Sequence, residues 1–152
     1  RILESIKQVM TPNQVQKAAQ YGVFMGYARA DELFALDLTD NLRAAGVNVW
    51  MDMTDVADSA DWHKSIRRAL KSCGVMLMVI SPMALQAGEL STECDWFMNS
   101  GKIVIPVMHK RCDYSHLQIY HQPVDFQHDQ RLGLQTLLRL LQEQKPTTAS
   151  LR

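Results

Sequence analysis

The stretch Gly22–Met108 decides the fold, because four short apolar runs recur within it: VFMGY at 23–27, VNVWMD at 47–52, VMLMVI at 75–80 and IVIPVM at 103–108. Segments with helical spacing of apolar residues separate these runs. Near-continuous apolar runs are typical of parallel strands covered on both faces, and their alternation with helices indicates an α/β fold. We therefore expect a flavodoxin-like, doubly wound, five-stranded parallel sheet flanked by helices, with the fifth strand at 124–126.

The segments between the strands predict the helices. Asp31 should begin the first helix, which presents a buried apolar stripe at helical spacing. Ser59 or Asp61 caps the second helix, and Cys73-Gly74 ends it. The stripe consists of Leu33, Phe34, Leu36, Leu38 and Leu42, the other helices are expected at 89–100 and 131–143, and 83–88 is expected to be a loop or short turn.

The same pattern divides the chain into three parts. Residues 1–20 look helical in two pieces, broken at Thr11-Pro12, and form an N-terminal helical arm or linker outside the strand–helix repeat. Residues 21–144 form one domain, and 145–152 are a polar, flexible tail. A chain of 152 residues suits a single domain with a substantial core.

Composition narrows the classes of function. The 16 basic and 16 acidic residues cancel, which argues against nucleic acid as the main partner, because phosphate binding requires a basic face. The apolar runs are too short to span a bilayer, so we expect no membrane segment. The three cysteines show no pairing pattern, which indicates free thiols in a reducing compartment and hence a cytoplasmic protein.

The turns after the strands exclude several nucleotide-binding folds. The turn 27–31 has no glycine, so neither a Rossmann fingerprint nor a P-loop is present. Ser81 ends the third strand where a phosphate-accepting receiver domain would need an acidic residue. The five histidines are scattered, and we therefore expect no metal site.

Taken in order, the motifs resemble a Toll/interleukin receptor (TIR) domain over about 21–144. The segment 23–31 is similar to the first box of the family, and 49–52 to its second strand. Ser81-Pro82, Glu93 and GKIVIPV at 101–107 match the end of the third strand, the catalytic helix and the fourth strand. Two positions depart from the family: Ser59 replaces a common glycine of the BB loop, and Glu89 replaces a tryptophan frequent in catalytic members. The positions where the BB loop and the following helix of the family carry an apolar residue, glycine, tryptophan and isoleucine fall on Val56, Ser59, Trp62 and Ile66.

The resemblance implies an activity, since some TIR domains cleave the bond between nicotinamide and ribose in NAD+. The nicotinamide ring of NAD+ is already a charged pyridinium, so it can depart without first being protonated. One carboxylate therefore suffices, whereas ordinary glycosidases use two, one of them as a proton donor. Glu93 would steady the ribosyl cation or act as a nucleophile. NAD+ is then the substrate, with no resident cofactor. The implied substrate-binding residues are Tyr27, Ala28, Arg29, Asp52, Trp62 and Ser81.

On residue chemistry alone, plainer alternatives stay open. Glu93 could be a solvated acid near a helix N-terminus, where the helix dipole favours negative charge. Trp62 could be a packing anchor, and Ser81 could simply terminate its strand with Pro82.

Three functions follow. The first is an NAD+ hydrolase that forms nicotinamide and ADP-ribose or a cyclic isomer, in immune or cell-death signalling through self-association. The second is a non-catalytic scaffold or adaptor that recruits other TIR domains, and the third is a nucleotide sensor without turnover. The adaptor would use the BB loop, with Asp55, Val56, Asp58 and Ser59 as contact residues.

Overall fold

The computed structural model describes residues 12–51, 68, 71–86, 88–115, 117 and 122–142. A five-stranded sheet with the order β2-β1-β3-β4-β5 lies at its centre, and every pairing in it is parallel. The predicted α/β class and strand number are therefore confirmed. The strands are β1 (Val23–Gly26), β2 (Val49–Met51), β3 (Val75–Ile80), β4 (Ile103–Met108) and β5 (Val124–Asp125).

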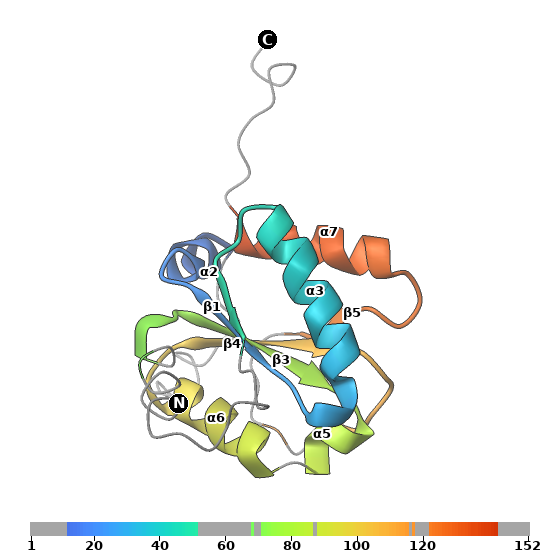
Figure 1. Ribbon diagram of the computed structural model, residues 1–152. Helices are drawn as coiled ribbons and strands as arrows, with labels where there is room; N and C mark the ends of the chain where they lie inside the picture. Colours follow the sequence, from blue (N-terminus) through green and yellow to red (C-terminus); the bar gives the residue numbers. More distant parts are fainter. Residues whose placement is uncertain are drawn as a thin grey trace.

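Helices cover both faces of the sheet (Figure 1). On one face lie α2 (Pro12–Ala19), α3 (Glu32–Ala44) and α7 (Gln130–Leu141), and on the other lie α5 (Pro82–Gln86) and α6 (Gly88–Asn99). Alternate residues of β3 supply the two cores: Val75, Leu77 and Val79 belong to the first, and Met76, Met78 and Ile80 to the second. All residues of β1, β3 and β4 are buried, which explains why these strands read as continuous apolar runs.

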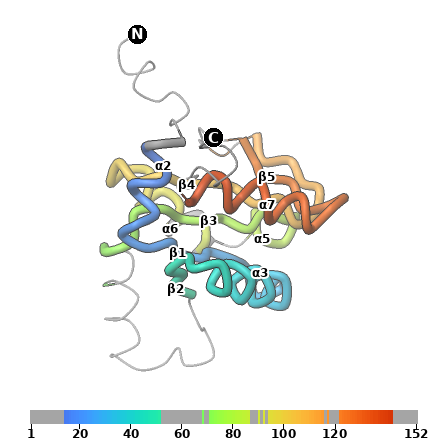
Figure 2. The backbone as a smooth tube through the Cα atoms, turned by 90° about the horizontal axis from the view of Figure 1, so that it is seen from above, coloured from blue at the N-terminus to red at the C-terminus, as the bar shows by residue number. Residues whose placement is uncertain are grey.

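The predicted N-terminal arm ends in a helix that packs into the core. Val15 of α2 is fully buried in the same cluster as Leu141 of α7, and the two helices lie side by side in Figure 2. The backbone of α2 also touches Gly74, where an added Cβ would come within 2.1 Å of the Ala18 carbonyl oxygen. Residues 12–19 are thus part of this packed unit, while residues 1–11 and the predicted tail 145–152 lie outside the described residues.

The predicted stripe of the first helix was wrong at Leu33, whose side chain is 83% exposed. A 3-10 turn, η1 (Arg29–Asp31), precedes α3, so the helix begins at Glu32 and not at Asp31. Leu33 is about 200° around the helix from the buried Ala35, which turns it toward solvent. The buried positions of α3 are Ala35, Leu38, Thr39 and Leu42, and Phe34 and Leu36 are partly buried.

Several boundaries also differ from prediction. The loop expected at 83–88 is wrong, because Pro82–Gln86 forms the short helix α5. Its start is set by Ser81, whose hydroxyl accepts a hydrogen bond from the Ala84 amide at 3.1 Å. The second strand begins later than predicted, at Val49, because Val47 still donates its amide to the Leu42 carbonyl of α3 after the left-handed turn at Gly46 (φ 94°). The second predicted helix, between 61 and 72, lies mostly outside the described residues.

Candidate functional site

The candidate site is the switch point of the sheet. From β1 the chain crosses through α3 to β2 on one side, and it returns to β3 on the other side of β1. In open α/β sheets, ligands bind beyond the carboxyl ends of the strands where the winding direction reverses. Here the carboxyl end of β1 meets β3, since Gly26 pairs with Met78 and β3 continues to Ile80. The loop 27–31 and Ser81 therefore meet at this edge.

A buried carboxylate lies at this edge. Asp31 is 3% exposed and Ser81 is 1% exposed. The Ser81 Oγ donates a hydrogen bond to Asp31 Oδ2 at 2.5 Å. The Asp31 amide donates to the Ala28 carbonyl at 2.8 Å, which closes the 3-10 turn after β1. Hydrogen bonds from a hydroxyl to a carboxylate are short and strong, and such bonds offset the cost of burying the charge.

His109, the first residue after β4, faces the same carboxylate. Its Nε2 lies 3.9 Å from Asp31 Oδ1, and its ring stacks on Phe34 of α3 with centroids 4.1 Å apart. Burial lowers the pKa of His109, the Asp31 charge opposes that shift, and the neighbouring Lys110 adds to it. We refer to Asp31, Ser81, His109 and Phe34 as the Asp31 cluster.

The Asp31 cluster is not a hydrolytic triad, although it contains serine, histidine and aspartate. In such triads the histidine lies between the serine and the carboxylate and takes the proton from the hydroxyl. Here Asp31 lies in the middle, and the Ser81 hydroxyl donates to it directly. Ser81 is also buried, so nucleophilic attack from its hydroxyl is excluded in this arrangement.

The structure brings together the predicted substrate-binding residues of the first turn. Tyr27 is half-buried against the α3 side of the core, Ala28 is buried, and Arg29 is exposed at the start of η1. Ser81 lies at the same edge, but its hydroxyl is engaged by Asp31 and by the Ala84 amide. Ser81 also ends its strand before Pro82, as the plainer alternative has it, and the structure adds its role as the cap of α5. Direct contact of Ser81 with a ligand stays a prediction.

Glu93 lies in α6, as predicted, and its side chain lies outside the described atoms, as does that of Glu89. The helix is held on the sheet by Leu90, Cys94 and Phe97, which are all buried as the helical spacing predicts. Burial raises the pKa of Cys94 to about 11, which agrees with an inert core thiol. Asp52, Trp62 and the predicted BB-loop contacts Asp55, Val56, Asp58 and Ser59 lie outside the described residues.

Sequence reasoning missed Asp31 and His109 as members of this site. From sequence, Asp31 is expected only to begin a helix, and His109 is one of five scattered histidines. The available signal was position, because His109 directly follows one strand, Ser81 directly follows another, and Asp31 lies five residues after Gly26. The carboxyl ends of parallel strands share one edge of the sheet, so polar residues at those ends are expected to meet.

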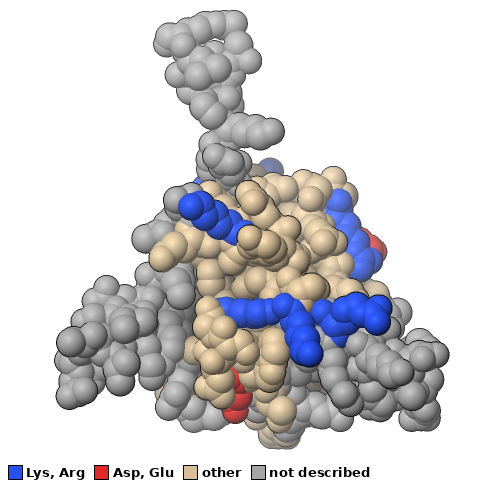
Figure 3. All heavy atoms as spheres, turned by 90° about the vertical axis from the view of Figure 1, so that its left-hand side faces the viewer, with Lys and Arg blue, Asp and Glu red and all other residues tan. Residues whose placement is uncertain are grey.

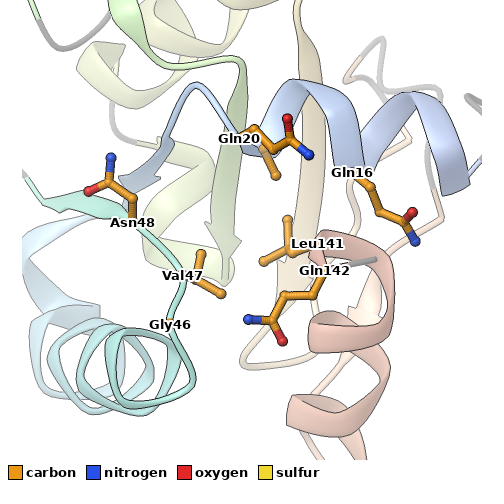
Figure 4. A pocket seen from close by; sticks show the side chains of 8 residues that line it. Gln16, Gln20, Gly46, Val47, Asn48, Leu141 and Gln142 are labelled. Carbon is orange, nitrogen blue, oxygen red and sulfur yellow. The ribbon is translucent and has the colours of Figure 1, made fainter. Parts of the chain in front are cut away.

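A hollow lies at the opposite, amino edge of the sheet. It has a volume of about 470 Å³ and is open to solvent, and Figure 4 shows carboxamide side chains around it. Basic side chains also gather on this side of the molecule (Figure 3), where the Lys102 ammonium donates to the Lys71 carbonyl at 2.6 Å. Because ligands of such sheets bind at the carboxyl edge, this hollow is not the candidate site. Its lining residues are Gln16, Ala19, Gln20, Gly46, Val47, Asn48, Leu141 and Gln142.

Within the described ranges, no three His, Cys, Asp or Glu side chains gather closely enough to hold a metal ion. All three cysteines are free. Among the helices that the structure describes, none combines the length and apolar character needed to cross a membrane.

Comparison with known proteins agrees with this architecture. The family model described as TIR domain matches residues 23–139. The 2' cyclic ADP-D-ribose synthase BtTIR of Bacteroides thetaiotaomicron is 27% identical over an alignment of 109 residues, which covers 68% of this chain and 38% of that protein. The chain thus spans about two fifths of that relative's length. The crystal structure of the TIR domain of the Toll-related receptor TRR-2 from Hydra magnipapillata has the same fold, with a TM-score of 0.61 and 17% identity over 77% of this chain and 94% of that one.

Proposed function

Since this chain belongs to the TIR domain family, we propose that it cleaves NAD+ at the bond between nicotinamide and ribose. The observation that carries the proposal is the similarity over 109 residues to a protein named as a 2' cyclic ADP-D-ribose synthase. NAD+ becomes 2' cyclic ADP-ribose when nicotinamide departs and the 2' hydroxyl of the adenosine ribose bonds to the carbon that nicotinamide left and loses its proton. A related site in this chain would begin with the same bond cleavage.

The chemistry needs few groups. Nicotinamide leaves as a neutral molecule from a pyridinium, so no general acid is required, and the barrier lies in the ribosyl cation. Glu93 is the carboxylate that we propose to stabilise this cation. Its helix supports the assignment, because α5 and α6 follow β3 directly and β3 ends at the switch point.

The substrate would lie across the carboxyl ends of β1 and β3. Arg29 is an exposed cation at this edge, and its guanidinium suits the pyrophosphate of NAD+. Tyr27 and Ala28 line the same turn. Asp52 and Trp62 complete the proposed binding set, with Asp52 accepting from ribose hydroxyls. Ser81 is proposed to contribute through the loop that it anchors.

The product depends on what attacks the ribosyl carbon after nicotinamide leaves. Water gives ADP-ribose, whereas an internal hydroxyl gives a cyclic isomer. We propose that this chain forms one or both in the cytoplasm, and that it self-associates through TIR–TIR contacts that include the BB loop, as part of immune or cell-death signalling. Self-association would also explain any dependence of turnover on protein concentration.

The decisive experiment incubates the purified chain with NAD+ over a range of protein concentrations and resolves nicotinamide, ADP-ribose and cyclic ADP-ribose by mass spectrometry. Glu93→Gln keeps the shape of the side chain and removes its charge, so nicotinamide release should fall by roughly a hundredfold or more. Asp95→Asn is the matched control, because Asp95 is an exposed acid on the same helix. Wild-type chain that stays as inactive as Glu93→Gln at every concentration would refute NAD+ cleavage, and TIR–TIR binding without turnover would favour the adaptor.

A further inference from the structure

We propose that Asp31 is a positioning residue that holds the loop after β1 in place for the substrate. This inference rests on the proposed function, because that loop carries the residues expected to bind NAD+. Asp31 itself is 3% exposed and is not expected to touch the substrate. Its effect would be transmitted through the backbone of the loop.

The carboxylate joins three separate segments of the carboxyl edge. It belongs to the loop after β1, it accepts from Ser81 after β3, and it faces His109 after β4. Each oxygen has its own neighbour, with Oδ2 accepting from Ser81 and Oδ1 lying 3.9 Å from the His109 ring. A neutral or shorter side chain could not hold both neighbours with the same strength.

The same residue controls the loop locally. The Asp31 amide donates to Ala28 at 2.8 Å, so residues 28–31 form a closed turn with Arg29 inside it. If the carboxylate is released from Ser81, the turn loses its link to β3. The exposed Arg29 side chain would then sample a wider range of positions over the switch point, and substrate binding would weaken.

A second histidine–aspartate pair in the chain provides a matched control. His128 Nε2 lies 3.9 Å from Asp125 Oδ2, the same separation as in the Asp31 cluster. The two side chains are 85% and 49% exposed and lie three residues apart in sequence. This pair joins no separate loops, so neutralising Asp125 should leave the loop after β1 unchanged.

The test compares wild type with Asp31→Asn and Asp125→Asn in two measurements. Peptide-level hydrogen exchange should show amides 28–34 exchanging roughly tenfold faster in Asp31→Asn, because a local opening becomes easier. In the NAD+ assay KM should rise roughly tenfold while kcat changes little, since a misplaced binding group weakens substrate binding more than it changes the reacting groups. Asp125→Asn should match wild type in both measurements.

Failure of the inference can be told apart from failure of the proposed function. If wild type cleaves NAD+ and Asp31→Asn keeps the wild-type KM and exchange rates, the positioning role is wrong and the activity stands. If wild type is inactive, the proposed function fails, and exchange alone decides whether Asp31 holds the loop. Should Asp31→Asn not fold, His109→Gln removes one of the two neighbours from a half-buried position. It should loosen the same amides, and unchanged exchange there would overturn the role.

Discussion

The hydroxyl of Ser81 donates a 2.5 Å hydrogen bond to the carboxylate of Asp31, which lies 50 residues earlier in the chain. The bond crosses the switch point of the sheet, between the loop after β1 and the turn after β3. Ser81 also caps α5 by accepting from the Ala84 amide. The buried side chain of Ser81 therefore donates to a carboxylate, caps a helix and links two loops.

Replacing Ser81 by alanine should destabilise the protein by about 3 kcal/mol, because a buried carboxylate loses its donor and α5 loses its cap. Chemical denaturation followed by circular dichroism measures this change. Ser100→Ala is the control, since Ser100 is exposed beyond the end of α6. A loss for Ser81→Ala no larger than for Ser100→Ala would contradict the role of the bond.

His109 should make stability depend on mildly acidic pH. Its pKa in the folded protein is lowered below the ordinary value of 6.5, mainly by burial, so between the two values the unfolded chain binds more protons. Stability is then complete above about pH 6.5 and falls as the pH drops toward the folded pKa. Denaturation at several pH values should show this fall in wild type and a smaller one in His109→Gln.

Imidazole NMR titration tests the cause of that shift directly. Asp31 raises the pKa of His109, so Asp31→Asn should lower it further, whereas Asp125→Asn should leave it unchanged. A His109 pKa above that of a free histidine in wild type, or one that does not respond to Asp31→Asn, would be inconsistent with the geometry of the Asp31 cluster.

Substitution of Gly74 should undock α2. An added Cβ would lie 2.1 Å from the Ala18 carbonyl oxygen, and this backbone atom cannot move aside without shifting the helix. We expect Gly74→Ala to cost about 3 kcal/mol and to speed hydrogen exchange across 12–19. Gly101→Ala is the comparison, because its Cβ would meet no atom within 4 Å and only the positive φ of 75° opposes it. That strain should lower the free energy of unfolding by about 1 kcal/mol. Hydrogen exchange in α2 should stay as slow as in wild type.

Substitution of Thr39 should raise the stability of the protein, unlike the substitutions above. It is 1% exposed in α3, and its hydroxyl has no hydrogen-bond partner among the described residues. Thr39→Val keeps the shape and removes the buried polar atom, so stability should rise by about 1 kcal/mol. Thr136→Val serves as control, because the Thr136 hydroxyl donates to the Leu132 carbonyl at 2.9 Å on an exposed helix face. A lower thermal midpoint for Thr39→Val would show that its hydroxyl is satisfied after all.

Secondary structure was predicted correctly from sequence where the pattern within a single segment is enough to identify it. The runs 75–80 and 103–108 coincide with β3 and β4 because strands buried on both faces need apolar residues at every position. Prediction failed where a residue inside a helix was assigned to the buried stripe on its apolar character alone. Leu33 faces solvent because the helical period places it about 200° from the buried Ala35, and counting apolar residues without that angle wrongly includes it in the stripe.

For the site, the sequence indicated the loop 27–29, Ser81 and the helix of Glu93, and it left the roles of Asp31 and His109 unrecognised. A lone aspartate before a helix normally reads as a cap, and a lone histidine after a strand reads as surface. Their importance comes from the position of the Asp31 carboxylate, which lies between the Ser81 hydroxyl and the His109 ring. Such a contact becomes visible only once the order of the strands is known.

The amino-acid sequence by itself determined the alternation of strands and helices and the membership of the family, because both are written in local patterns of apolar residues and in motifs taken in order. Only the tertiary structure decided that α2 packs beside α7, and that Asp31, Ser81 and His109 meet at one edge. The physical reason is that burial of a strand is a property of each segment, whereas contacts between distant loops depend on strand order and on the packing of helices across the sheet.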